Sequence, residues 1–138
     1  MPTPDAEIEI ERHQEVPGLS PVAKYAYAQA ISAGAFVFLA GQAGLDETGQ
    51  LVSLEFEQQA RRTFANIERA LQHVGSTLSD IVTMTVFITD WRYGPDLVRV
   101  RQDVLGDDLI PSALIGVSQL ADPAMLVEIQ CTAVRRGK

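Results

Sequence analysis

Hydrophobic residues recur along this chain with two different periods, and the periods separate expected strands from expected helices. Residues 7–11 alternate glutamate with isoleucine, which is typical of a strand with one face in water. After a loop rich in proline and glycine, residues 26–34 and 35–46 predict two further strands, joined as a hairpin around residues 32–34. A second turn is expected at residues 48–49.

The first expected helix shows apolar residues three or four positions apart, the spacing that places them on one helix face. Ser53 is expected to cap its N-terminus. Gly75 is expected to end it, because glycine readily adopts the conformation that stops a helix. The apolar stripe consists of Phe56, Ala60, Phe64, Ile67, Leu71 and Val74.

A second helix is expected to begin at Gly94 and Pro95, because a proline in the first turn forfeits no helical hydrogen bond. Gly106 is expected to end it. Its apolar face consists of Leu97, Val100, Val104 and Leu105. Three apolar runs predict the other strands: residues 81–89, 112–120 and 126–134.

The elements follow the order strand, hairpin, helix, strand, helix and two strands, which predicts an α+β fold. At 138 residues the chain is expected to form a single domain, residues 1–138, with both helices packed on one face of the sheet. The other face would then lack a covering layer. Because exposed apolar faces mark interaction surfaces, we expect an oligomer.

The composition is that of a soluble globular protein, with 46% hydrophobic and 21% charged residues. Lysine and arginine total 11 against 18 acidic residues, and the net charge of −7 disfavours nucleic acid or an anionic membrane as the main partner. No apolar run is long enough to cross a bilayer, and the acidic first residues lack the layout of a signal peptide. A cytoplasmic location is therefore expected.

The residue types that carry chemistry offer few conventional sites. His13 and His73 have no further ligand at metal-binding spacing, so no metal is expected. Cys131, the one cysteine, excludes a disulfide within the chain, and it is expected to be a core residue because no base adjoins it. The basic clusters at residues 61–62 and 135–138 lack the interleaved aromatic residues of an RNA-binding groove.

Glu128 stands out because it lies between Val127 and Ile129 in an otherwise apolar strand. A buried carboxylate is costly unless it is paired. By strand alternation Glu128 shares a face with Gln130, whereas Cys131 lies on the opposite face. The pattern alone leaves two interpretations open: a solvated strand face, or part of a functional site.

Four longer segments carry a combined pattern: SPVAKYAYAQAI, AFVFLAGQAGLDETGQLV, QARRTFANIERALQHVGSTLSDIVTMTVFITD and LADPAMLVEIQCTAV. In this order and spacing they resemble the Rid (YjgF-type) family of reactive-intermediate imine deaminases, over nearly the whole chain. The resemblance implies a chorismate-mutase-like fold with a mixed sheet, in a homotrimer around a central barrel. It also implies small-molecule clefts between subunits, and hydrolysis of imines or enamines without a cofactor.

Carried over position by position, the family's site is incomplete. Its glutamate corresponds to Glu128 and its tyrosine to Tyr27, and both are present. Its serine corresponds to Ala40, and the asparagine of its second helix to Val98. The resemblance therefore implies that Glu128 is the catalytic residue. The cleft walls are expected to include Tyr27, Ala40, Gly41, Val98, Ala113 and Ile115.

The substrate-binding arginine of the family falls on Ala113, or on Ser112 if the match shifts by one, and neither is a cation. Arg92 or Arg99 would replace it only if the fold brought one of them into the cleft. Loss of a buried guanidinium contact would cost about 2–5 kcal/mol of binding. A free 2-imino acid is therefore disfavoured as the substrate.

Three hypotheses about function remain. The first is a cofactor-independent hydrolase or deaminase acting on a small neutral imine or enamine. In it, Glu128 is the acid or base, with a pKa raised by an apolar cleft, and Tyr27 orients the substrate. The second is a non-catalytic trimer that binds a small ligand or another protein. The third, ribonuclease activity, is the least favoured because the chain is acidic.

Overall fold

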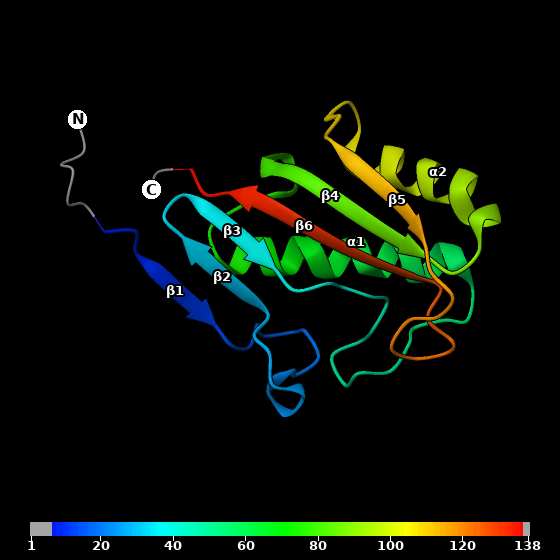
Figure 1. Ribbon diagram of the computed structural model, residues 1–138, viewed down its shortest axis with the longest axis horizontal. Coiled ribbons are helices and arrows are strands. Elements are labelled where there is room, and N and C mark those ends of the chain that lie inside the picture. The colour runs from blue at the N-terminus through cyan, green and yellow to red at the C-terminus, as the bar shows by residue number, and fades with distance from the viewer. Residues whose placement is uncertain (1–6, 137–138) are drawn as a thin grey trace.

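The computed structural model describes residues 7–136, which form one six-stranded sheet and two α-helices on one side of it (Figure 1). The helices are α1 (Phe56–His73) and α2 (Gly94–Leu105). The strands are β1 (Ile10–His13), β2 (Ala30–Ala33), β3 (Phe36–Leu39), β4 (Ile81–Ile88), β5 (Ser112–Gly116) and β6 (Val127–Val134). The predicted α+β class is confirmed.

The strands lie in the order β1-β2-β3-β6-β4-β5, so the last strand of the chain is inserted between the hairpin and β4. Only β4 and β5 run parallel among these six strands, and every other neighbouring pair is antiparallel. The helix α2 makes the crossover from β4 to β5, as parallel strands require. The sheet is therefore mixed.

The two helices and the strands β4 and β6 lie close to their expected bounds, whereas β2, β3 and β5 are shorter than the expected segments 26–34, 35–46 and 112–120. The helix α1 buries its predicted stripe, and Gly75, with a φ of 83°, ends it as expected. The expected cap at Ser53 is wrong. The N-cap is Glu55, and the Ser53 hydroxyl instead accepts a hydrogen bond from the Glu55 amide at 2.9 Å, which stabilises a turn before the helix. The first strand also begins later than expected, at Ile10.

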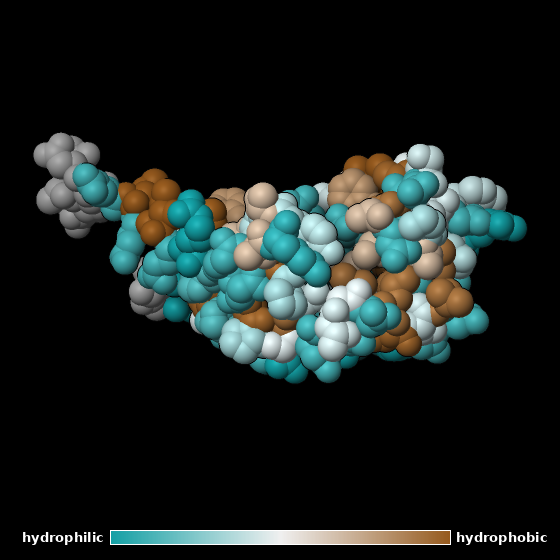
Figure 2. All heavy atoms as spheres, turned by 90° about the horizontal axis from the view of Figure 1, so that it is seen from below, coloured by the Kyte–Doolittle hydropathy of each residue, from teal (hydrophilic) through white to brown (hydrophobic). Residues whose placement is uncertain are grey.

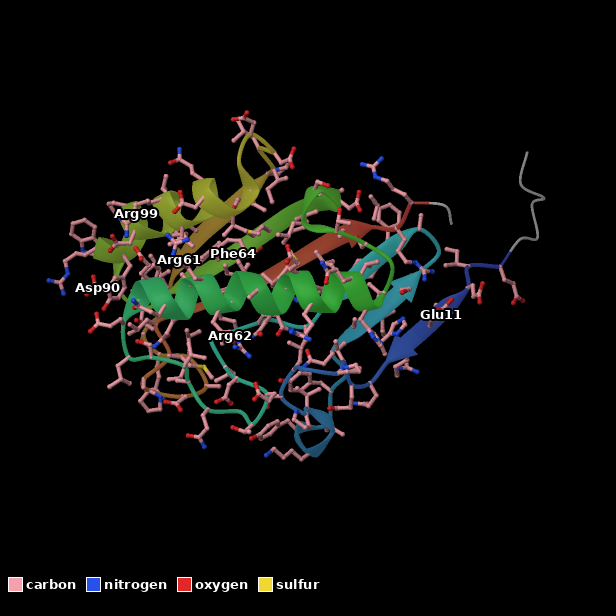
Figure 3. The ribbon with its side chains drawn as sticks, turned by 180° about the vertical axis from the view of Figure 1, so that it is seen from behind. Glu11, Arg61, Arg62, Phe64, Asp90 and Arg99 are labelled. Carbon is pink, nitrogen blue, oxygen red and sulfur yellow. The ribbon has the colours of Figure 1, made fainter. Side chains whose placement is uncertain are left out.

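The two faces of the sheet differ in burial. Residues such as Val37, Val86 and Ile129 have 0% exposure on the face that packs against the helices. On the opposite face, Phe36 and Phe38 remain 50% and 48% exposed. Figure 3, which views the molecule from behind, shows both helices on the same side of the sheet. The expectation of one covered and one open face is confirmed.

Two buried amide side chains of α1 hold the loops at one end of the sheet. Gln59 donates to the carbonyls of Ser53 and Ala124 at 3.0 and 2.9 Å, and it accepts from the amide of Leu126 at 2.8 Å. Asn66 donates to the carbonyls of residues 43 and 45 at 3.0 and 2.9 Å. The loop that follows β3 and the loop that precedes β6 are therefore both attached to α1.

Within residues 7–136, no helix combines the length and the apolar character needed to span a membrane. The single domain over residues 1–138 stays a prediction, because residues 1–6 and 137–138 lie outside the described part of the chain.

Gln59→Ala is expected to lower the free energy of unfolding by about 2–4 kcal/mol, because three buried backbone groups lose their partner. The neighbouring Gln58 is exposed, so Gln58→Ala is the matched control and should change the value by less than about 0.5 kcal/mol. Urea unfolding at one fixed protein concentration measures both. Equal losses for the two variants would contradict the role of Gln59.

Candidate functional site

A cleft with a volume of about 640 Å³ lies at one end of the sheet. Its walls come from three segments that are distant in sequence, residues 19–29, 41–50 and 121–128, and from Asn66 of α1. These segments lie along the lower edge of the molecule in Figure 1. Figure 2 views this edge directly and shows hydrophilic and hydrophobic side chains intermixed on it. The cleft therefore presents both polar and apolar groups to a ligand.

Glu128 reaches this cleft from β6. It lies opposite Phe87 of β4 on the open face of the sheet, and it is partly buried. Its carboxylate has no hydrogen-bond or ion-pair partner among residues 7–136. Burial raises the pKa of Glu128 above the ordinary carboxyl value. Of the two interpretations that the sequence left open, these features favour a site.

Gly41 makes room for the Glu128 carboxylate. A Cβ at position 41 would lie 2.6 Å from Glu128 Oε2 and 3.0 Å from its Cδ, which is closer than real Cβ contacts allow. The adjacent Gln42 pairs with Ile129 through both of its backbone groups, at 2.8 and 2.9 Å. This pairing holds Gly41 beside Glu128.

Tyr27 lines the same cleft. Burial raises the pKa of its phenol, and the negative charge of Glu128 raises that pKa further. The phenol therefore stays protonated at neutral pH, as a hydrogen-bond donor within the electrostatic influence of the Glu128 carboxylate.

The charged residues of the cleft do not favour an anionic ligand. Within the described chain, Lys24 is the one basic residue that lines it, against the acidic residues Asp122 and Glu128. The Lys24 ammonium lies over the ring of Tyr25, 5.2 Å from its centroid. A single exposed lysine is a flexible point charge, without the planar fork with which arginine binds a carboxylate.

The other expected wall residues do not line the cleft of their own chain. Ala40 precedes Gly41 but lies outside the cleft lining. Ala113 and Ile115 lie on the open face of β5, and Ile115 is separated from Glu128 by one strand. Val98 lies on α2, beside a smaller hollow on the helical side. Their role in a cleft between subunits stays a prediction.

Neither candidate replacement for the family's arginine lines the cleft. Arg92 binds Asp90 through two nitrogens and holds the pKa of that carboxyl at about 2. Arg99 donates to Asp96 at 3.0 Å and also pairs with Glu57 of α1. Figure 3 shows Arg99 near Arg61, between the two helices. Arg92 and Arg99 are therefore both paired with acidic residues outside the cleft that holds Glu128.

Several groups near the site were not found by sequence reasoning. Arg101 of α2 donates to the Ser112 hydroxyl at 2.9 Å, but it does not line the cleft that holds Glu128. Lys24, Gln29 and Gln42 line the cleft. All three belong to segments quoted above for the family resemblance, but nothing in their spacing marked them as cleft residues.

No group of three His, Cys, Asp or Glu residues in the described chain is arranged to hold a metal ion. The rings of His13 and His73 meet edge to face, with their centroids 5.5 Å apart. Cys131 is buried on the core face, opposite Glu128, as predicted. Burial raises the pKa of its thiol to about 12, so it is not a nucleophile at neutral pH.

Comparisons with a family model, with related sequences and with solved structures all find proteins of the same kind. A model of the family described as endoribonuclease L-PSP matches residues 18–135. A RutC family protein of Aquifex aeolicus is 34% identical over 119 residues, which cover 84% of this chain and 94% of that protein. A 2-iminobutanoate/2-iminopropanoate deaminase of Dermatophagoides farinae is 28% identical, over 78% of this chain and 84% of its own. The crystal structure of a Rid-family protein of unknown function from Yersinia pestis matches with a TM-score of 0.84 at 28% identity, covering 91% of this chain and 99% of its own.

Glu128→Gln is expected to stabilise the protein at neutral pH relative to the native chain. Because the folded-state pKa of Glu128 is raised, the folded protein binds this proton more tightly than the unfolded chain does. The native protein should therefore lose stability as the pH rises from the ordinary carboxyl value through the raised pKa, and the variant should not show this loss. Thermal unfolding from pH 4 to 8 measures the difference.

Glu68→Gln controls for the removal of one negative charge, because Glu68 lies on the exposed side of α1. A stability difference between native protein and Glu128→Gln that stays constant over this pH range would contradict the raised pKa.

Proposed function

Because the chain belongs to the endoribonuclease L-PSP family, together with the Rid and RutC proteins that it matches, we propose that it hydrolyses small imines or enamines without a cofactor. The observation that supports this most is the unpaired, partly buried carboxylate of Glu128 beside Gly41 and Tyr27 in the cleft. An isolated carboxyl with a raised pKa is suited to proton transfer near neutral pH.

In the proposed reaction, Glu128 accepts a proton from water as the water oxygen bonds to the imine carbon. The imine nitrogen takes up a proton from solvent, so the adduct is a neutral carbinolamine. Glu128 then returns its proton to the nitrogen, the carbon–nitrogen bond breaks, and the hydroxyl proton is released to solvent as ammonia and a carbonyl compound leave. Tyr27 donates a hydrogen bond that orients the substrate. Each imine consumes one water, and the carboxylate is regenerated.

We propose a neutral substrate in preference to a free 2-imino acid. Ser112 and Ala113 supply no cation at the family's arginine position, and Arg101, which donates to Ser112, does not line the cleft that holds Glu128. Lys24 is opposed by two acidic residues of the same cleft. An anionic substrate would lose the bidentate contact, at a cost of about 2–5 kcal/mol.

Two other activities are weighed against this proposal. A non-catalytic ligand-binding or regulatory trimer is favoured by the apolar side chains of Ala40, Val98 and Ala113, which cannot bond the polar parts of a substrate. Cleavage of RNA, the activity in the family's description, is disfavoured because the chain carries a net charge of −7.

The proposed assembly is a homotrimer whose clefts lie between subunits. Phe36, Phe38 and Ile10 are each about half exposed or more on the open face of the sheet, and a facing subunit would cover them. A neighbour would also bring a second set of wall residues to the cleft, including Ala113 and Ile115. The cytoplasmic location expected from the sequence stays a prediction.

Glu128→Gln is expected to reduce ammonia release from in situ generated neutral imines by about 10²–10⁴-fold, because the amide cannot accept a proton. Tyr27→Phe should lower the rate less, since it removes one orienting hydrogen bond. The assay offers neutral and carboxylate-bearing imines side by side, with Glu68→Gln as the control. Undiminished turnover in Glu128→Gln would refute the role of this residue. Saturable binding without any ammonia release by the native protein would favour the non-catalytic alternative.

Phe38→Asp is expected to dissociate the proposed trimer into monomers, because it places a charge in the centre of the open sheet face. Leu54→Asp is the matched control, since Leu54 is 74% exposed on a loop before α1. Light scattering coupled to size-exclusion chromatography measures the mass of each variant. A native protein that elutes as a monomer would contradict the assembly.

A further inference from the structure

The cleft contains a second polar group whose orientation is fixed by the fold, the side-chain amide of Gln42. Gln42 is only 6% exposed, and it lines the cleft. Its Nε2 donates to Gln29 Oε1 at 2.9 Å and to the carbonyl of Ala40 at 3.3 Å. The nitrogen end of this amide is therefore engaged inside the protein.

Gln29 prevents the Gln42 amide from turning over. The Nε2 of Gln29 donates to the backbone carbonyl of Ser20 at 3.1 Å, and a carbonyl can only accept. The oxygen of Gln29 must therefore face Gln42. If the Gln42 amide flipped, two amide oxygens would oppose each other in a buried place, with no proton between them. The relay from Ser20 through Gln29 thus sets the direction of the Gln42 amide.

The Oε1 of Gln42 is the end of this relay, and it is free. No donor reaches it among residues 7–136. It is not fully enclosed by protein atoms either, so it keeps contact with solvent. The other two buried polar side chains of the cleft have both ends engaged: Gln29 as described, and Asn66 through Ala43 and Arg62. Among the buried side chains of the described cleft, Gln42 therefore offers the unengaged acceptor.

The position of this acceptor relative to Glu128 is also fixed. The backbone of Gln42 pairs with Ile129, the residue that follows Glu128, through two hydrogen bonds. By alternation, Gly41 faces Glu128, and the side chain of Gln42 points to the other side of the strand. The two acceptors therefore project from opposite sides of this strand pair.

We propose that Gln42 Oε1 accepts a hydrogen bond from an N–H group of the ligand, so that the cleft selects molecules that carry an amide or amine donor. A ligand with a methyl group in place of this donor would displace water and leave a buried acceptor without a donor. This ligand preference concerns the cleft of the proposed function. Its relevance to the reaction rests on that function, whereas the binding preference itself does not.

The test compares two probes of the same shape, butanamide and 2-pentanone, which differ by an NH₂ in place of a CH₃. The full-length protein is titrated with each and followed by NMR. The native protein should bind butanamide about threefold to tenfold more tightly. Gln42→Met keeps the length of the side chain and should remove the preference. Gln50→Met is the matched control, because Gln50 lines the cleft but is exposed, and it should retain the preference.

A second measurement covers the case in which Gln42→Met does not fold, since that change leaves Gln29 without its donor. In the native protein, the side-chain carbonyl ¹³C shift of Gln42 should move with butanamide and not with 2-pentanone. Equal affinity of the two probes, no binding of either, or a preference that survives in Gln42→Met would overturn the inference. The titration measures binding and needs no turnover. Its result can therefore be interpreted even if the ammonia assay shows no imine hydrolysis.

Discussion

The cleft depends on a constraint that applies to any buried loop: its backbone carbonyl and amide groups need partners, and no strand ladder supplies them. In this protein α1 supplies them from its buried side. Gln59 and Asn66 bind backbone groups on both sides of the cleft, and Gly44 approaches so closely that a Cβ there would lie 2.8 Å from Gln59 Cα. Packing against the helix alone would leave these polar groups unsatisfied. The side-chain amides of Gln59 and Asn66 therefore hold the loops in place, although the loops have no regular secondary structure.

The strand β6 joins the stability of the protein to its chemistry. Its alternate residues, Val127, Ile129 and Cys131, complete the core, and Glu128 projects from the other side. Burial is the one cause behind the raised pKa of Glu128, without a contribution from a neighbouring charge. The proton affinity of this carboxyl therefore depends on how well the open face is covered. A subunit that seated itself there would raise it further.

Periodicity was sufficient to predict the helices, the strand order along the chain and the opposite faces of Glu128 and Cys131, because each follows from local geometry. The roles of Gln59 and Gln42 could not be predicted in this way, because they do not follow from local geometry. A polar residue beside an apolar stripe is usually solvated, and only tertiary contacts make it buried. The family resemblance identified Glu128 and its neighbours in the cleft. The same resemblance also predicted Ala113 as a wall residue, but Ala113 does not line the cleft of its own chain.

The close fit of Gly41 to Glu128 also restricts how this protein can change over time. Neither position can be judged alone, since an alanine at 41 is compatible only with a carboxylate that has moved or become shorter. The same holds in reverse, because a smaller residue at 128 would leave a void above the glycine. A substitution at one of these two distant points of the sequence would therefore change the placement of the acidic group in the cleft while leaving the fold the same.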